Sequence, residues 1–225
     1  MLGANLVPAG QFLPADAIVF NLEQIVRGAM WFLPSYVELM KRHKVWDYSE
    51  GNVEPLARLG ITDVDVVPIG YVPELTRIPT REKTIDVLFY CSGNPRRERI
   101  LQDLYFRGVK VESIFGVYGA ERDEWIARSH AVINIHFYEL RLFEIVRIGY
   151  LLANAIFVVT EQSADREFEL EFRDGLALAP YEGLVETTLR YLADDAARAS
   201  VARRGFEIFS SRDQSAALAP AIRRL

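Results

Sequence analysis

The sequence predicts a doubly wound α/β fold, with parallel strands covered by helices on both faces. Short apolar runs of strand length recur along the chain, and segments with helical spacing of apolar residues separate them. The clearest example is 131–161, where apolar runs at 131–135 and 156–159 enclose a helical segment. Strand, helix and strand in about thirty residues form one βαβ unit. Such near-continuous apolar strands are typical of a parallel sheet that is buried on both faces.

Composition limits the class of protein. The 225 residues suffice for one large or two small domains, and half of them are hydrophobic. The net charge of −5 argues against a general nucleic-acid binder, because phosphate binding needs clustered Lys and Arg. The single cysteine, Cys91, excludes an intramolecular disulfide and suits a reducing compartment, so we expect a cytoplasmic protein. We identify neither a membrane span nor a signal peptide.

The first third of the chain has three predicted strands, at 17–22, 44–48 and 64–69. Helices are predicted between them, at 34–43 and 50–59. Pro34 suits the first turn of a helix, Ser49 is a good N-cap, and Gly60 ends the second helix.

A proline-containing, charged segment at 72–83 follows. It is either a linker between two α/β lobes or a long surface loop of one domain, and we prefer the linker. The lobes would then be residues 1–75 and 84–210, with 211–225 as a C-terminal tail or helix.

The second lobe has the more regular pattern. Strands are predicted at 85–90, 109–115, 131–135, 156–159 and 175–179. Helices are predicted at 96–106, 120–128, 144–155, from 182 past 192, and at 196–210, and 162–173 is an acidic loop or short helix.

A glycine turn joins the predicted strand 85–90 to the next helix. It consists of Ser92, Gly93, Asn94 and Pro95, with Arg96 and Arg97 at the helix start. Backbone N–H groups and the helix dipole favour an anion here, and two arginines can bind a diphosphate through bidentate hydrogen bonds. The turn matches neither Walker A nor G-x-G-x-x-G, so an ordinary turn with solvated arginines is an equal alternative.

A second glycine-bracketed loop, 116–119, follows the strand 109–115. Tyr118 could stack on a base there. Taken by itself, the loop is better explained as an ordinary connection between a strand and a helix.

Polar residues collect where the strand 131–135 ends and the next helix begins. They are Asn134, His136, Tyr138, Glu139, Arg141 and Glu144. Open α/β sheets bind ligands at this carboxyl edge, so we expect the site there. His136 is a candidate catalytic residue, although a lone histidine is more often a structural hydrogen-bonding group. Glu144 could accept hydrogen bonds from a ribose diol or simply pair with Arg147 along the helix.

In the first lobe, Glu23 and Gln24 form a second polar pair, and Glu23 is a candidate catalytic base facing an acceptor. A metal site has little support, because the three histidines do not form a spaced cluster and one cysteine cannot make a zinc site. The sequence has no G-x-S-x-G motif of a serine hydrolase.

Five segments carry a resemblance to a known family. They are NLEQI (21–25), VWDYSEGN (45–52), VPIGYVPEL (67–75), DVLFYCSGNPRR (86–97) and the spaced INIHFYE…FEIVRIGYLLAN…VVTE (133–161). On these segments, and over most of residues 17–210, the chain resembles the GT-B glycosyltransferases, in particular bacterial family 1 or CgeB-like members.

The resemblance implies two Rossmann-like lobes and an enzyme that transfers sugar from a nucleotide-sugar, such as a UDP- or GDP-sugar, to an unknown hydroxyl acceptor. It implies no bound metal and no permanent cofactor. The residues that it places around the donor are Glu144 at the ribose, Gly93, Arg96 and Arg97 at the diphosphate, and Asn134, His136 and Tyr138 along the pocket.

The chain departs from the family in two ways. Glu139 and Glu144 are closer than the two glutamates of many GT-B enzymes. The first lobe also has only three predicted strands, where a full nucleotide-binding lobe has about five or six. The protein is thus a fragment, or a partner completes a reduced lobe. A non-catalytic nucleotide- or sugar-binding module is the alternative function. The apolar stretch 31–33 is either core or interface, so a homo-oligomer is one option.

Overall fold

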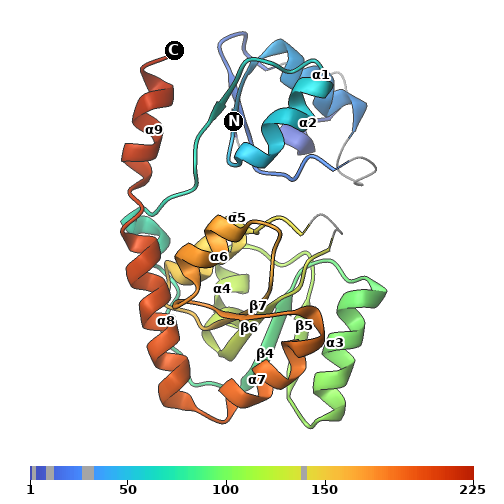
Figure 1. The fold of residues 1–225 in the computed structure, drawn as a ribbon, viewed down its shortest axis with the longest axis vertical. Helices are drawn as coiled ribbons and strands as arrows, with labels where there is room; N and C mark the ends of the chain where they lie inside the picture. The colour runs from blue at the N-terminus through green and yellow to red at the C-terminus, as the bar shows by residue number, and fades with distance from the viewer. Residues whose placement is uncertain (2–3, 9–12, 27–32, 138–140) are drawn as a thin grey trace. The chain divides into compact units, whose positions relative to one another are not determined.

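The computed structural model describes residues 1, 4–8, 13–26, 33–137 and 141–225. The chain packs as two compact units, one of Met1–Gly70 with Asp213–Leu225 and one of Tyr71–Arg212. Figure 1 shows the elements of each unit. Within the described residues, no helix is both long and apolar enough to cross a membrane.

The first unit contains a parallel three-stranded sheet. Its strands are β1 (Ile18–Asn21), β2 (Lys44–Asp47) and β3 (Val64–Val66), in that order. The three predicted strands are confirmed, with shorter bounds. Helix α1 (Pro34–Arg42) begins at its proline as expected and packs Tyr36 and Met40 into the core.

The segment 50–59, predicted as one helix, is a 3-10 turn, η2 (Glu50–Asn52), followed by α2 (Val53–Arg58). Two local features explain the difference. The Ser49 hydroxyl caps the 3-10 turn by accepting a hydrogen bond from Gly51 N–H. Pro55 lacks an N–H group, so it suits only the first turn of the α-helix.

Helix α9 (Gln214–Ile222), from the C-terminal segment, packs with this first unit. The Gln214 side chain accepts from Gly70 N–H at 2.7 Å and donates to Pro68 O at 3.2 Å. The Arg224 guanidinium donates to Asp65 at 2.8 Å. Two ends of the sequence therefore contribute to one packed unit.

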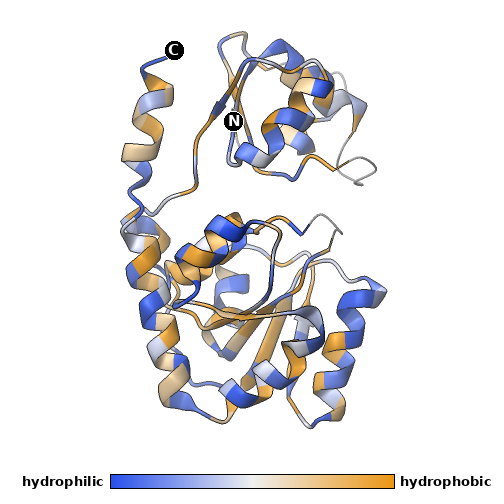
Figure 2. Ribbon diagram, viewed as in Figure 1, coloured by the Kyte–Doolittle hydropathy of each residue, from blue (hydrophilic) through white to orange (hydrophobic). Residues whose placement is uncertain are grey.

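The second unit is built on a parallel five-stranded sheet of order β5-β4-β6-β7-β8. The strands are β4 (Ile85–Tyr90), β5 (Val111–Ile114), β6 (Ser129–Asn134), β7 (Val158–Glu161) and β8 (Ala177–Ala179). All five predicted strands are confirmed. Figure 2 shows apolar residues concentrated along them, as expected for strands buried on both faces.

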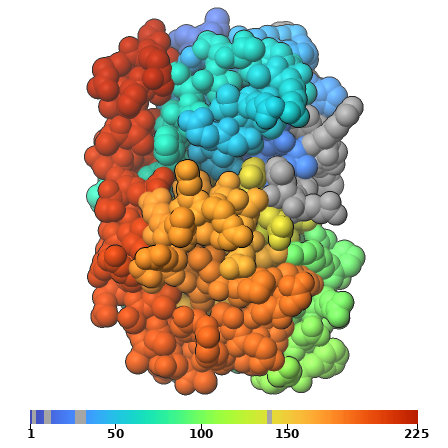
Figure 3. Space-filling view, in the orientation of Figure 1, coloured from blue at the N-terminus to red at the C-terminus, as the bar shows by residue number. Residues whose placement is uncertain are grey.

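Helices connect these strands and cover the sheet. They are α3 (Pro95–Phe106), α4 (Gly119–Ala127), α5 (Ile145–Leu152), α6 (Arg166–Phe172), α7 (Leu184–Leu192) and α8 (Asp195–Ser210). Helix α3 packs beside α7, whereas α8 packs against α5 and α6 (Figure 1). The orange and red segments, from the later part of this unit, cover much of its face in Figure 3, with green segments at the lower right.

The helix predicted at 144–155 is shorter than expected at both ends. Glu144 precedes α5 with the non-helical angles φ −83° and ψ 57°. Ala155 has φ +50°, a conformation that ends a helix. Glu144 therefore lies at the helix start, where its side chain is held by tertiary contacts.

Residues 72–83 contain the short 3-10 turn η3 (Pro73–Leu75) and are bonded to the second unit. The Thr76 hydroxyl donates to Ala153 O at 2.7 Å. The Arg77 and Ile78 N–H groups both donate to the Asn154 side chain at 2.8 Å. This segment therefore packs on the C-terminal end of α5.

Two glycines allow α8 to lie against the turn before β8. A Cβ atom on Gly205 would lie 2.7 Å from Gly175 O and 2.6 Å from Leu152 Cδ2. A Cβ atom on Gly175 would lie 2.5 Å from Gly205 Cα. Backbone cannot yield as the end of a side chain can, so both positions require glycine.

Gly205→Ala should lower the free energy of unfolding by about 1–3 kcal/mol through overpacking, even though alanine favours a helix. Urea unfolding followed by circular dichroism measures this change. Ser200→Ala, on an exposed position of the same helix, is the control and should be close to neutral. Undiminished stability of the Gly205→Ala protein would contradict the close packing.

Candidate functional site

The candidate site lies at the carboxyl ends of β4 and β6. These strands are neighbours, but the chain leaves β4 toward β5 on one side and leaves β6 toward β7 on the other. Ligands of open α/β sheets bind in the crevice at such a switch point. The loops 91–94 and 135–137 begin there. The sequence predicted a site at this edge, and the strand order places the two predicted clusters on adjacent strands.

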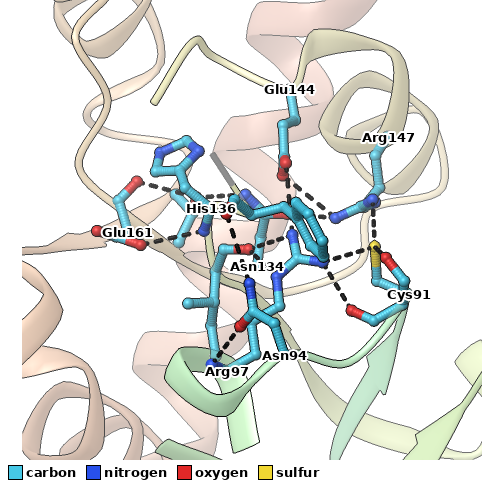
Figure 4. Close-up of polar contacts among 12 residues, drawn as sticks. Cys91, Asn94, Arg97, Asn134, His136, Glu144, Arg147 and Glu161 are labelled. Carbon is cyan, nitrogen blue, oxygen red and sulfur yellow. Dashed lines mark hydrogen bonds and ion pairs between the residues drawn. The ribbon is translucent and has the colours of Figure 1, made fainter. Parts of the chain in front are cut away.

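The buried Arg97 guanidinium joins these two loops (Figure 4). Its side chain is 1% exposed. Its Nε and Nη2 atoms donate to Ile135 O at 2.8 and 2.5 Å, and Nη1 donates to Ser92 O at 2.9 Å and Cys91 Sγ at 3.0 Å. Arg97 is thus committed to contacts within the protein. Arg97 supports both loops through these contacts, and its position near the diphosphate, which the resemblance implies, stays a prediction.

Arg96 and Glu161 form an ion pair across the same edge. Both guanidinium Nη atoms donate to the Glu161 carboxylate, and Nη1 lies 2.7 Å from Oε2. Glu161, the last residue of β7, is 1% exposed. The Tyr181 ring lies 4.0 Å from the Arg96 guanidinium, and its hydroxyl donates to Arg96 O at 2.7 Å. Arg96 is therefore also held by the protein, although its side chain remains 36% exposed.

The His136 peptide lies between these two charged groups. Its N–H donates to Glu161 Oε2 at 3.0 Å, and its carbonyl accepts from Arg96 Nη1 at 3.2 Å. The imidazole is 2% exposed, and neither ring nitrogen has a hydrogen-bond partner within the described part of the chain. Burial lowers the pKa of His136, against the Glu144 and Glu161 carboxylates, which raise it. The ring is therefore neutral at pH 7 and can both donate and accept one hydrogen bond.

Glu144 and Arg147 form a second charged pair beside Arg97. Arg147 Nη1 lies 3.2 Å from the Glu144 carboxylate, and Arg97 Nη2 lies 3.7 Å from it. Arg147 also donates to Asn134 Oδ1 at 2.8 Å and to Cys91 Sγ at 2.9 Å. The pairing of Glu144 with Arg147, one of the two sequence interpretations, is present. The Glu144 side chain keeps 14% of its surface exposed, so a ligand can still reach it.

Charged side chains of both signs meet at this edge. Three guanidinium groups, on Arg96, Arg97 and Arg147, face the carboxylates of Glu144 and Glu161, and the Glu98 carboxylate lies beside Gly93 in the turn before α3. The N-terminus of α3 points to the same loops and adds partial positive charge. Such an edge suits an anionic ligand whose hydroxyl groups can donate to a carboxylate.

The turn before α3 is organised by its own side chains. Asn94 is the N-cap, since its Oδ1 atom accepts from Arg97 N–H at 2.8 Å. Its Nδ2 atom donates to Phe137 O at 3.4 Å. Ser92 and Gly93 complete the turn, and Asn134 is fully buried and donates to Thr160.

Three predicted residues lie apart from this cluster or outside the described residues. Tyr118 is 74% exposed and follows β5, the outer neighbour of β4. Tyr138 and Glu139 fall in the segment that the structure does not describe. Among the described residues, no group of three or more His, Cys, Asp or Glu side chains is placed to hold a metal ion.

Sequence reasoning missed Glu161 and Tyr181 as members of the cluster, and named Arg147 only as a helical partner of Glu144. Glu161 had a usable signal, because it follows a predicted apolar strand at the ligand-binding edge. Tyr181 had none, because its contacts with Arg96 join segments that are distant in sequence.

The first unit has its own buried polar cluster at the ends of β1 and β2. Asp47 is 0% exposed and accepts from Asn21 Nδ2 at 2.6 Å, Ser49 N at 2.9 Å and Asn52 Nδ2 at 3.0 Å. Glu23, the predicted base, follows β1 and accepts from Asn5 Nδ2 at 3.3 Å. Burial raises the pKa of Asp47 to about 6, although these hydrogen bonds lower it.

Arg97→Lys should lower the free energy of unfolding by about 3 kcal/mol, because an ammonium group cannot serve the carbonyls of both loops. Urea unfolding measures the loss. The matched control is Arg99→Lys, an exposed residue of the same helix, which should change stability by less than about 0.5 kcal/mol. Equal effects of the two substitutions would show that the buried contacts carry little of the stability.

The raised pKa of Asp47 predicts that the stability of the protein depends on pH. This pKa is raised in the folded protein from 3.8 to about 6, so the folded state binds the proton more tightly than the unfolded state. The contribution of this group to stability is therefore present below pH 4 and is lost as the pH rises to about 6. The loss amounts to about 3 kcal/mol.

Asp47→Asn removes this titration. The stability of the variant relative to the wild type should rise between pH 4 and pH 7, as measured by urea unfolding at several pH values. A difference that stays constant with pH would show that Asp47 keeps an ordinary pKa.

Comparisons with known proteins show the fold. No family model matches the chain. A curated relative, uncharacterized protein L138 of Acanthamoeba polyphaga mimivirus, is 29% identical over 113 residues, which are 49% of this chain and 13% of that protein. The chain thus spans only a small part of this relative.

Solved structures resemble almost the whole chain. HepE (Alr3699) of Anabaena, solved in complex with UDP and glucose, has a TM-score of 0.67 and 14% identity, covering 93% of this chain and 72% of that one. Sucrose-phosphate synthase of Thermosynechococcus elongatus has a TM-score of 0.60 and 13% identity, with 92% and 66% covered.

A trehalose-phosphate synthase of Burkholderia vietnamiensis has a TM-score of 0.57 and 11% identity, with 93% and 68% covered. These neighbours share one architecture. The chain therefore has the GT-B fold of glycosyltransferases, as the sequence resemblance implied.

Proposed function

We propose that the protein is a glycosyltransferase that binds a nucleotide-sugar at the carboxyl edge of the β4–β8 sheet and transfers its sugar to a hydroxyl acceptor. The observation that carries the proposal is the cluster at the β4/β6 switch point of a chain with the GT-B fold. It combines a helix N-terminus, arginines from α3 and α5 and an accessible carboxylate. A nucleoside diphosphate carries the complementary groups, which are phosphate oxygens and ribose hydroxyls.

Each group has a proposed role. Glu144 accepts hydrogen bonds from the ribose diol, and Arg147 holds its carboxylate in place. The loop 91–94 and the start of α3 receive the diphosphate through backbone N–H groups. As the glycosidic bond breaks, negative charge grows on the leaving diphosphate, and these fixed dipoles and cations stabilise it. No step in this scheme requires a bound metal.

UDP is the first nucleotide to test, with GDP as the second choice. The Anabaena neighbour was solved with UDP and with UDP-glucose, which supports this order. We place the reaction in the cytoplasm of a bacterial cell, without a permanent cofactor, and leave a homo-oligomer as an option. Glu23 at the end of β1 is the proposed base for the acceptor hydroxyl, and Tyr118 is the proposed stacking partner of the nucleotide base.

The second candidate is a non-catalytic nucleotide- or sugar-binding module. The observation that favours it is the three-stranded sheet described for the first unit, which is small for a nucleotide-binding lobe. Both candidates bind a nucleotide, but only the glycosyltransferase releases UDP from UDP-sugar.

Glu144→Gln should weaken nucleotide binding about 10- to 100-fold, because it removes charge-assisted hydrogen bonds worth about 1.5–3 kcal/mol. A thermal-shift titration with UDP, GDP and their glucose conjugates, with and without magnesium, measures this effect. For the wild type, ligand at 100 times its Kd stabilises the folded state by about 2.7 kcal/mol.

Glu207→Gln is the matched control, since Glu207 also pairs with an arginine three residues away but is exposed on α8. It should bind as the wild type does. Equal nucleotide affinity of the Glu144 and Glu207 variants would show that Glu144 does not bind the nucleotide. Nucleotide binding without release of UDP, in an assay that offers a range of hydroxyl acceptors, would favour the non-catalytic module.

A further inference from the structure

We infer that the Arg96–Glu161 ion pair is a positioning device for His136, which holds the buried imidazole at the edge where the nucleotide-sugar would bind. The inference rests on the proposed function for the identity of the ligand. The positioning itself is a property of the free protein, so it can be tested separately.

The first argument is the geometry of the His136 peptide. The peptide groups on both sides of His136 Cα are held by the same ion pair, since Glu161 Oε2 accepts from the N–H at 3.0 Å and Arg96 Nη1 donates to the carbonyl at 3.2 Å. The two charged residues come from different elements, α3 and β7. They fix the direction in which the side chain leaves the backbone at the end of β6.

The second argument is that the pair is itself rigid. Glu161 is almost fully buried, and the Arg96 fork binds it through both Nη atoms. The Tyr181 ring covers the guanidinium at 4.0 Å, and the Tyr181 hydroxyl fixes the Arg96 carbonyl. A buried carboxylate costs stability unless it is paired, so these contacts hold Glu161 in one position.

The environment of the His136 imidazole also supports the inference. The imidazole is 2% exposed, and its two ring nitrogens have no partner among the residues that the structure describes. Figure 4 shows no interaction joining the ring to the surrounding cluster, while its backbone is bonded on both sides. A buried polar group that lacks a partner is unfavourable, and a hydrogen bond to a ligand would offset this cost.

The charged groups that act on the ring are Glu144, Glu161 and Arg96, and burial is the largest influence. The direction in which the pKa of His136 changes when Glu161 is removed therefore distinguishes two roles of Glu161. If Glu161 acted only through its negative charge, its removal would lower the pKa of His136 further. If Glu161 holds the residue in its buried position, its removal lets the ring reach water, and the pKa rises toward the ordinary value of about 6.5.

The experiment is a pH titration of the histidine rings of the ¹⁵N-labelled, ligand-free full chain by NMR. The His136 signal is assigned by its absence in His136→Asn. We expect Glu161→Gln to raise the pKa of His136. Glu186→Gln, which breaks the exposed Arg107–Glu186 pair of the same unit, is the control and should leave it unchanged. An unchanged or lowered pKa in Glu161→Gln would overturn the positioning role.

Arg96→Lys decides the question if Glu161→Gln does not fold. It keeps the positive charge but loses the two-pronged contact with Glu161, so the pKa of His136 should again rise. No rise in a folded Arg96→Lys protein would overturn the inference.

A second measurement tests whether the Arg96–Glu161 pair affects ligand binding through His136. UDP-glucose binding, measured by calorimetry, should weaken about tenfold in Glu161→Gln and in His136→Asn, and the double variant should be no worse than either single one. Additive losses would show that Glu161 acts independently of His136. If the wild type binds no nucleotide-sugar, the proposed function fails, while the NMR titration still decides the positioning.

Discussion

The contact on which the second unit depends most is the Arg97 guanidinium between the loops after β4 and β6. At a switch point the chain leaves neighbouring strands in opposite directions, which opens a crevice and leaves loop carbonyls without sheet partners. Arg97 supplies donors to these carbonyls on both sides. A buried guanidinium also has to be fully paired, so its presence fixes the paths of both loops.

Around this arginine, most charged groups are already paired within the protein. Arg96 is held by Glu161 and Tyr181, and Arg147 by Glu144, Asn134 and Cys91. A ligand would therefore meet groups whose positions are set before binding. Catalytic sites that stabilise developing charge use such fixed dipoles and ions, because no reorganisation is then needed during the reaction.

The polar clusters of the two units stabilise a buried carboxylate in different ways. Glu161 is paired with a guanidinium, whereas Asp47 is held by the amides of Asn21 and Asn52 and the Ser49 N–H. The guanidinium neutralises the charge, and the amides only solvate it. Burial therefore raises the pKa of Asp47. The Asp47 cluster of the first unit is therefore sensitive to pH near pH 6.

Much of the fold follows from the sequence by itself. Apolar runs of strand length, helical spacing and punctuation by Pro34, Ser49, Pro95 and Gly108 depend on neighbours in the chain, so they place the strands and most of the helices of both units. The same local information locates the site at the carboxyl ends of the strands 85–90 and 131–135. It also selects Arg97, His136 and Glu144 as members of the site.

Only the tertiary structure decides what these residues do. From the sequence alone, Arg96 and Arg97 are equivalent candidates for the same role. In the structure, Arg97 donates to the loop carbonyls, whereas Arg96 binds the carboxylate of Glu161, sixty-five residues away. The sequence cannot show that Glu161 belongs beside His136, that the helix after Glu144 begins at Ile145, or that α9 packs with the first unit. These outcomes depend on contacts between distant segments, whose energies no local pattern of residues records.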